Sequence, residues 1–111
     1  MDYYFIGDPE LVTAFRFIGI DGVVAHDAEE AIGMFNKITS GETDALLPPN
    51  ALSCRVLIIT EEIAGWLDAL LVSWQLSGNY PLIVEIPGIM GRLPNRKTLV
   101  DSIREAIGVN V

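Results

Sequence analysis

The chain has 111 residues, half of them hydrophobic, which is enough for one compact domain with its own core. Its formal net charge of −8 argues against nucleic acid as a partner, because phosphate contacts need lysine and arginine. A single cysteine, Cys54, excludes an internal disulfide, and its place before an apolar run predicts a small buried or edge residue. No apolar stretch is long enough to span a bilayer and no basic leader opens the chain, so we expect a cytoplasmic protein.

The first predicted unit is a strand followed by a helix. Residues 3–6 are continuously aromatic or apolar, as in a strand that is covered on both faces. Asp8 is placed to cap a helix, and Pro9 suits the first helical position. The helix is predicted to end at Gly19, and its apolar positions are Leu11, Phe15 and Ile18.

The same pattern repeats in the next part of the chain. Residues 22–26 predict a short strand, and Asp27 is expected to cap a second helix with Glu30 as its capping-box partner. This helix is predicted to end near Ser40. Residues 42–53 are predicted to form a surface loop, because two consecutive prolines interrupt them.

Two further strand and helix pairs follow. Residues 55–59 predict the clearest strand, and residues 60–77 predict one long helix. A fourth strand is expected at 82–86, and a last helix from about residue 95 to 107, after a link punctuated by glycines. The apolar residues expected on one broad face of the long helix are Ile63, Trp66, Leu67, Leu70, Leu71 and Trp74.

Strict alternation of strand and helix is typical of a parallel sheet with helices on both faces. Four strands in this length predict a small flavodoxin-like α/β fold with a C-terminal amphipathic helix. We expect residues 1–88 to form the sheet domain and residues 89–111 to form the link and the last helix.

The sequence predicts no catalytic, cofactor or metal site. The turn after the first strand holds two acids, Asp8 and Glu10, which would repel a phosphate, and no glycine-lysine phosphate loop occurs. A phospho-receiver domain needs an aspartate at the end of the third strand, where this chain has Thr60. His26 is the only histidine and lacks thiols or carboxylates at ligand spacing, so we expect a strand-end residue.

The C-terminal segment differs in charge from the rest. Residues 1–91 carry 13 acidic and 3 basic side chains, whereas residues 92–111 carry 2 acidic and 4 basic ones. The predicted last helix has an apolar stripe and off-stripe bases, which suits either packing on the sheet or binding in a partner's groove. Composition leaves both alternatives open. The candidate partner-binding residues are Arg92, Arg96, Leu99, Val100, Ile103, Arg104 and Ile107.

Four blocks of the sequence resemble the F subunits of V-type and A-type ATPases, in the order of that family. They are Phe5 to Pro9 with Ala14 to Ile20, Leu57 to Ala64, Pro81 to Gly88, and Ile103 to Val109. Together they cover nearly the whole chain. The loop between Gly41 and Arg55 departs from the family pattern because it is longer than expected.

The resemblance implies a non-catalytic rotor subunit of the central stalk. Such a protein binds the long coiled-coil stalk subunit, called the D subunit, and its C-terminal helix can extend toward the catalytic hexamer. It would help to couple ATP turnover to proton or sodium transport, on the cytoplasmic side of a membrane and without entering it. The alternative from another class is a degenerate receiver-like domain that binds a protein or small ligand.

Overall fold

The computed structural model describes residues 3–40 and 54–88, and both the predicted loop at 42–53 and the last helix predicted from about residue 95 to 107 lie outside them. The described chain forms a four-stranded sheet, in the order β2-β1-β3-β4, in which all neighbours are parallel. This order confirms the α/β fold expected from the alternation of elements. The strands are β1 (Tyr3–Gly7), β2 (Gly22–Val24), β3 (Val56–Thr60) and β4 (Leu82–Ile86).

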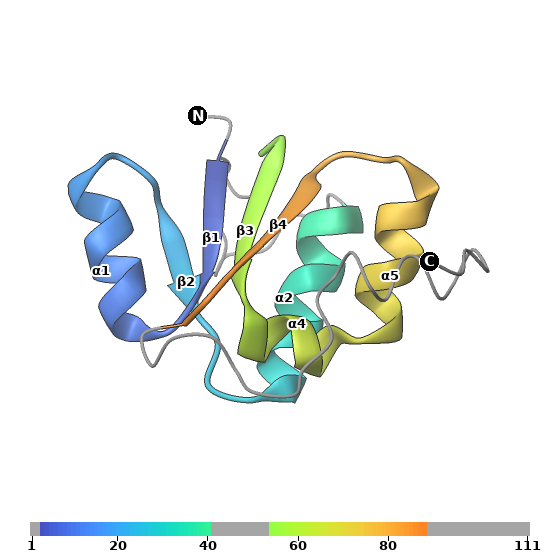
Figure 1. Cartoon of the computed structure of the whole chain (residues 1–111), viewed down its shortest axis with the longest axis horizontal. Helices are drawn as coiled ribbons and strands as arrows, with labels where there is room; N and C mark the ends of the chain where they lie inside the picture. Colours follow the sequence, from blue (N-terminus) through green and yellow to red (C-terminus); the bar gives the residue numbers. More distant parts are fainter. Residues whose placement is uncertain (1–2, 41–53, 89–111) are drawn as a thin grey trace, which may run out of the picture.

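The helices lie on both faces of the sheet, with α1 on one side and α2, α4 and α5 on the other (Figure 1). Right-handed crossovers explain this division. The connection from β1 to β2 runs in one direction along the sheet, and the next two connections run in the opposite direction. The helices are α1 (Pro9–Phe17), α2 (Ala28–Ser40), α4 (Glu61–Leu67) and α5 (Ala69–Ser77).

The larger core lies between the sheet and helices α2, α4 and α5, and we call this side the closed face. Here the side chains of Tyr4, Ile6, Leu57 and Ile59 are buried by residues from the three helices. Phe35 of α2 also meets Trp74 of α5 edge to face, with ring centroids 6.3 Å apart. Three helices on one face of a small sheet therefore supply most of the buried apolar surface.

The opposite side of the sheet has a smaller core. Phe5, Val12 and Ile58 are buried there beside α1, and the Phe5 and Phe15 rings lie 4.6 Å apart. In the described residues α1 is the only helix on this side, and it packs over β1 and β2. The half of the sheet formed by β3 and β4 therefore has less cover.

The predicted helix over 60–77 is wrong in one respect, because the structure breaks it into α4 and α5 at Asp68. Asp68 has a φ of 45° and a ψ of −114°, which lie outside the α-helical region, so one helix cannot run through this residue. A straight helix of this length would run about 25 Å, beyond the roughly 17 Å of a five-residue strand. The break lets Leu67 and Leu71 both reach the closed face, whereas Leu70 turns outward.

Two smaller differences concern element ends. β2 stops at Val24 and not at residue 26, and β3 runs from Val56 to Thr60, one residue later than predicted. Helix α1 ends at Phe17, so Ile18 is a largely exposed C-cap residue rather than part of an apolar face. The predicted end of the long helix at residue 77 is confirmed, and Gly78 follows it as a C-cap residue with a φ of 72°. Helix α2 is described up to Ser40.

Candidate functional site

The carboxyl edge of a parallel sheet is where ligands of such folds bind. Among the described residues this edge holds a cavity of about 40 Å³, lined by residues that include Asp8, Thr60, Glu62 and Trp66. Its volume is far below that of ordinary ligand pockets, which begin at about 300 Å³. Two carboxyl groups in its lining would also repel a phosphate. As far as residues 3–40 and 54–88 form it, this edge therefore has neither the cavity volume nor the charge that a nucleotide site needs.

Two residues at this edge occupy the N-cap positions of helices, Asp8 before α1 and Thr60 before α4. Thr60, which stands where a receiver domain has its aspartate, accepts a hydrogen bond from the backbone N–H of Ile63 at 3.3 Å and caps α4. Asp8 occupies the N-cap position of α1, but its side chain makes no capping hydrogen bond. The predicted cap is therefore wrong for the Asp8 carboxylate, which instead lines the small cavity with Thr60.

The acids at the start of α4 also differ from each other. Both Glu61 and Glu62 lie in its first turn, but only Glu62 is exposed. Glu61 is buried, as is the neighbouring Thr60. The sequence contains no signal for this burial, because an acid in a first helical turn is ordinarily solvated.

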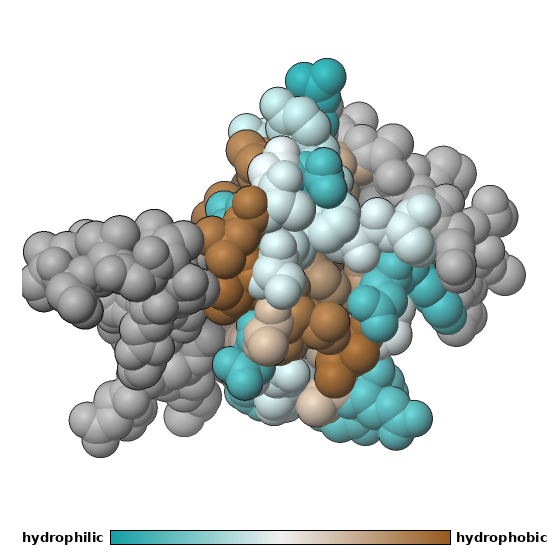
Figure 2. All heavy atoms as spheres, turned by 90° about the vertical axis from the view of Figure 1, so that its right-hand side faces the viewer, coloured by the Kyte–Doolittle hydropathy of each residue, from teal (hydrophilic) through white to brown (hydrophobic). Residues whose placement is uncertain are grey.

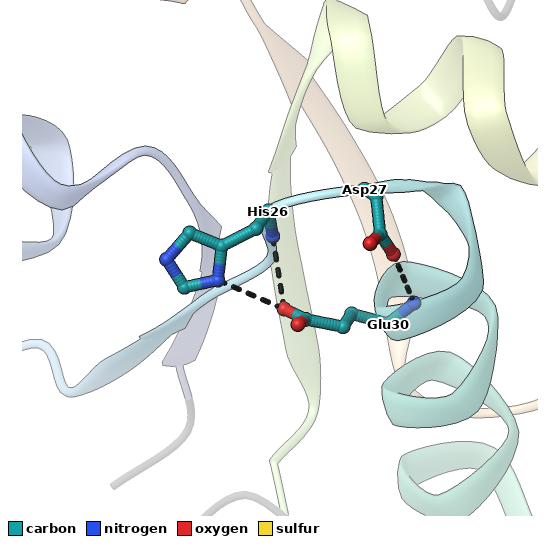
Figure 3. Close-up of polar contacts among 3 residues, drawn as sticks. All are labelled: His26, Asp27 and Glu30. Carbon is teal, nitrogen blue, oxygen red and sulfur yellow. Dashed lines mark hydrogen bonds and ion pairs between the residues drawn. The ribbon is translucent and has the colours of Figure 1, made fainter.

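His26 belongs to the start of α2 (Figure 3). The Asp27 carboxylate accepts the backbone N–H of Glu30 at 2.9 Å, which confirms the predicted cap. The Glu30 carboxylate accepts the backbone N–H of His26 at 3.0 Å and lies 2.9 Å from its Nδ1, so it reaches one residue further back than a capping box does. These hydrogen bonds hold the pKa of Glu30 below its usual range.

Neither His26 nor Cys54 has the surroundings of a reactive or metal-binding group. Within residues 3–40 and 54–88, no three histidine, cysteine or acidic side chains converge to hold a metal ion. Cys54 is buried in the core of the closed face, as predicted. Burial raises the pKa of its thiol to about 11, so the thiolate is disfavoured near neutral pH.

The side of β4 that faces away from the closed face is an exposed apolar surface. Leu82 and Val84 pair with Val56 and Ile58, which belong to the smaller core, so all four point to the α1 side. The side chains of Leu82 and Val84 remain 46% and 44% exposed. We call this pair the open face.

Helix α5 is a second apolar surface. Its sequence contains no charged residue, yet Leu71 is its only buried residue. Trp74 anchors it by donating a hydrogen bond from Nε1 to the carbonyl oxygen of Pro81 at 2.9 Å. Leu70 and Leu76 are 40% and 46% exposed. Seen from the α5 side, apolar residues reach the surface in separate areas among polar ones (Figure 2).

A shallow groove runs beside α5, between this helix and α2. It encloses about 540 Å³, and it is lined by polar residues of α2 together with Trp74. Because its lining lacks converging charged groups, we assign it no ligand. The lining residues are Gly33, Asn36, Lys37, Thr39, Ser40 and Trp74.

None of the residues predicted to bind a partner can be placed, because all seven lie between residues 92 and 107, outside the described part of the chain. The candidate surfaces that the structure adds are the open face and α5. Of the two exposed leucines of α5, Leu70 was expected on the broad apolar face of the long helix, and Leu76 was not among the predicted residues. The longest helix of the described residues, α2, has 13 residues, and none is long and apolar enough to cross a membrane.

Comparisons with known proteins agree with this arrangement. The sequence profile of the ATP synthase (F/14-kDa) subunit family matches residues 4–107. The F subunit of the A-type ATP synthase of Methanocaldococcus jannaschii is 32% identical over 108 residues, which cover 96% of this chain and 94% of that protein. The match decides against the receiver-like alternative. An accessory subunit of this kind has no catalytic activity by itself, in keeping with the chemistry of the sheet edge. The chain belongs to the F-subunit family of the A-type and V-type ATP synthases.

Proposed function

We propose that the chain is a rotor subunit of the central stalk, which binds the coiled-coil D subunit of that stalk and helps to couple ATP turnover to proton or sodium transport. The observation that carries the proposal is the family match, which extends from the first strand through the tail at residues 4–107. A protein that only transmits rotation needs apolar surface for its partners and no catalytic group. The open face and α5 provide such surface.

The tail is the proposed contact with the rest of the machine. Residues 92–111 are net basic, whereas the preceding 91 residues are strongly acidic. A helix from about residue 95 to 107 would carry the apolar stripe of Leu99, Ile103 and Ile107, with Arg96 and Arg104 beside it. The stripe would pack against the coiled coil, and the bases would speed association with acidic surfaces of the stalk or hexamer.

In the free protein we propose that the same stripe covers the open face. The described chain leaves the sheet at Gly88, where an added Cβ would lie 3.8 Å from Asp8 at the start of α1. Leu82 and Val84 of the preceding strand remain partly exposed on the α1 side, which gives the stripe an apolar surface to cover. Folding back would exchange one apolar contact for another, so the two states need differ by only a few kcal/mol.

The test is reconstitution with the coiled-coil stalk subunit of the same complex. The full chain should bind it, and deletion of residues 92–111 should leave a folded sheet domain that binds more weakly and couples ATP turnover to rotation poorly. Replacing Arg96 and Arg104 by glutamate should slow association and change its salt dependence, whereas Ile103→Asp should weaken binding in any salt. A truncated chain that assembled and coupled like the full one would refute the role of the tail.

A further inference from the structure

The outward side of α5 has the spacing of a helix-packing seam. On a helical projection, Ala69, Val72 and Leu76 fall within about 60° of one another and opposite the buried Leu71. Their spacings of three and then four residues are those of the a and d positions of a coiled coil. We call these three residues and Ser73, which lies beside them, the outer stripe of α5.

The outer stripe meets solvent in the structure. Ala69, Ser73 and Leu76 are exposed and Val72 is half-buried. A surface helix ordinarily presents charged or polar residues on its outward side, and a helix that is apolar all round is ordinarily buried. The small side chains of Ala69 and Ser73 leave room for another helix to approach closely. The outer stripe is therefore built to pack against a helix that the described residues do not include.

The charge around α5 helps to decide which helix packs on the outer stripe: one from a second copy of the chain, the chain's own tail, or a partner protein. From residue 56 to residue 91 the sequence contains four acids and no lysine or arginine, and exposed Asp68 directly precedes the stripe. A second copy of the chain, which also carries a net charge of −8, would bring like charges together. The chain's own tail has its proposed place on the open face, and the stability of the variants below tests whether it covers the stripe instead. The remaining fit is a partner helix that has lysine or arginine beside its apolar seam.

We propose that the outer stripe of α5 is a docking surface for one helix of the coiled-coil stalk subunit, with basic residues of that helix near Asp68. The sheet domain then makes a contact of its own, on the side of the molecule opposite to the open face. This inference rests on the proposed function, since it names where on the sheet domain the same partner binds. Two contacts on one partner would hold the protein in a single orientation as the stalk rotates.

Two leucines of α5 provide a matched test. Leu76 lies in the outer stripe and Leu70 lies about 120° around the helix from it, and their exposures of 46% and 40% are nearly equal. Binding of the full chain to the recombinant stalk subunit is measured by calorimetry. Leu76→Glu should raise Kd at least tenfold, whereas Leu70→Glu should change it less than threefold. Equal effects of the two substitutions would overturn the proposal.

A second variant tests whether weaker binding could come from a loss of folding stability. Ser73 is exposed, so Ser73→Arg should leave the urea midpoint unchanged, but its bulk and positive charge oppose a basic helix and should also raise Kd at least tenfold. If Leu76→Glu or Ser73→Arg strongly destabilises the isolated chain, the stripe is covered by the chain itself and the proposal fails. If the unmodified chain does not bind the stalk subunit at all, the proposed function fails as well. Binding that depends on residues 92–111 alone leaves that function standing and removes this surface from it.

Discussion

The two faces of the sheet are covered very unequally. Helices α2, α4 and α5 bury the closed face, whereas α1 covers only the β1 and β2 half of the other side. Adjacent residues of β4 show the difference directly, because Ile83 points to the closed face and is buried while its neighbours Leu82 and Val84 are nearly half exposed. Among the described residues, one side of the sheet therefore supplies most of the core, and the other side keeps exposed apolar side chains.

The largest expected effect is a difference between two leucines on the two faces. Leu57→Ala opens a cavity in the core of the closed face and should lower the free energy of unfolding by about 2–5 kcal/mol. Leu82→Ala on the open face should cost about 0.5 kcal/mol or a little more, because half of that side chain already meets solvent. Urea unfolding followed by circular dichroism measures both. Similar costs would mean that the tail covers Leu82 tightly.

The next effect concerns how α5 is held against the closed face. Trp74→Phe keeps an aromatic ring beside Phe35 but removes the donor to the buried carbonyl of Pro81, which should cost about 1–3 kcal/mol. The control is Trp66→Phe, which makes the same change on α4. If both substitutions cost the same in thermal unfolding, ring size and not the hydrogen bond holds α5.

A smaller effect is expected at the start of α2. Asp27→Ala removes the acceptor for the Glu30 N–H and should cost about 0.5–2 kcal/mol, whereas Asp27→Asn should retain most of the stability because asparagine also caps. Both are measured by urea unfolding. A large loss in the asparagine variant would show that the charge at position 27, and not the hydrogen bond, is what stabilises α2.

The exposed pair of Glu30 and His26 adds a weak pH dependence. Because the folded pKa of Glu30 is depressed, its contribution is present above the unfolded pKa and is lost as pH falls through the folded pKa. Glu30→Gln should therefore flatten the stability profile on the acidic side of about pH 4.3, the ordinary value for glutamate. A profile that is unchanged by this substitution would contradict the assignment.

Much of the fold could be predicted because periodicity reports which side of an element is apolar. The alternation of strands and helices led to the parallel sheet, and both the cap at Asp27 and the helix end at residue 77 could be predicted from local sequence. The break at Asp68 could not be found this way, since apolar spacing continues through it from Ile63 to Trp74. The positive φ at Asp68 changes the direction of α5, and as a result the side chain of Leu70 is exposed.

The candidate site was less predictable for a related reason. Sequence spacing tells which residues share a face of a helix, but not whether a neighbouring element covers that face. Leu82 and Val84 look like any strand residues until the register shows that they lie beyond the reach of α1. The burial of Glu61 was missed in the same way. The tail's role remains a prediction drawn from charge and spacing.

Thiol labelling probes the two faces with the smallest effect on stability. Cys54 on the closed face has a pKa of about 11, so it should react with iodoacetamide at pH 8 far more slowly than in urea. Because that pKa lies above the ordinary value of about 8.5, the folded state should lose stability as pH rises from about 8.5 to 11.

Val84→Cys places a second thiol on the open face, and it should be labelled quickly where solvent reaches it. Deleting residues 92–111 from this variant should speed labelling further if the tail folds back over β4. Equal rates with and without the tail would place its resting position elsewhere, and fast labelling of Cys54 under native conditions would show that the closed face opens.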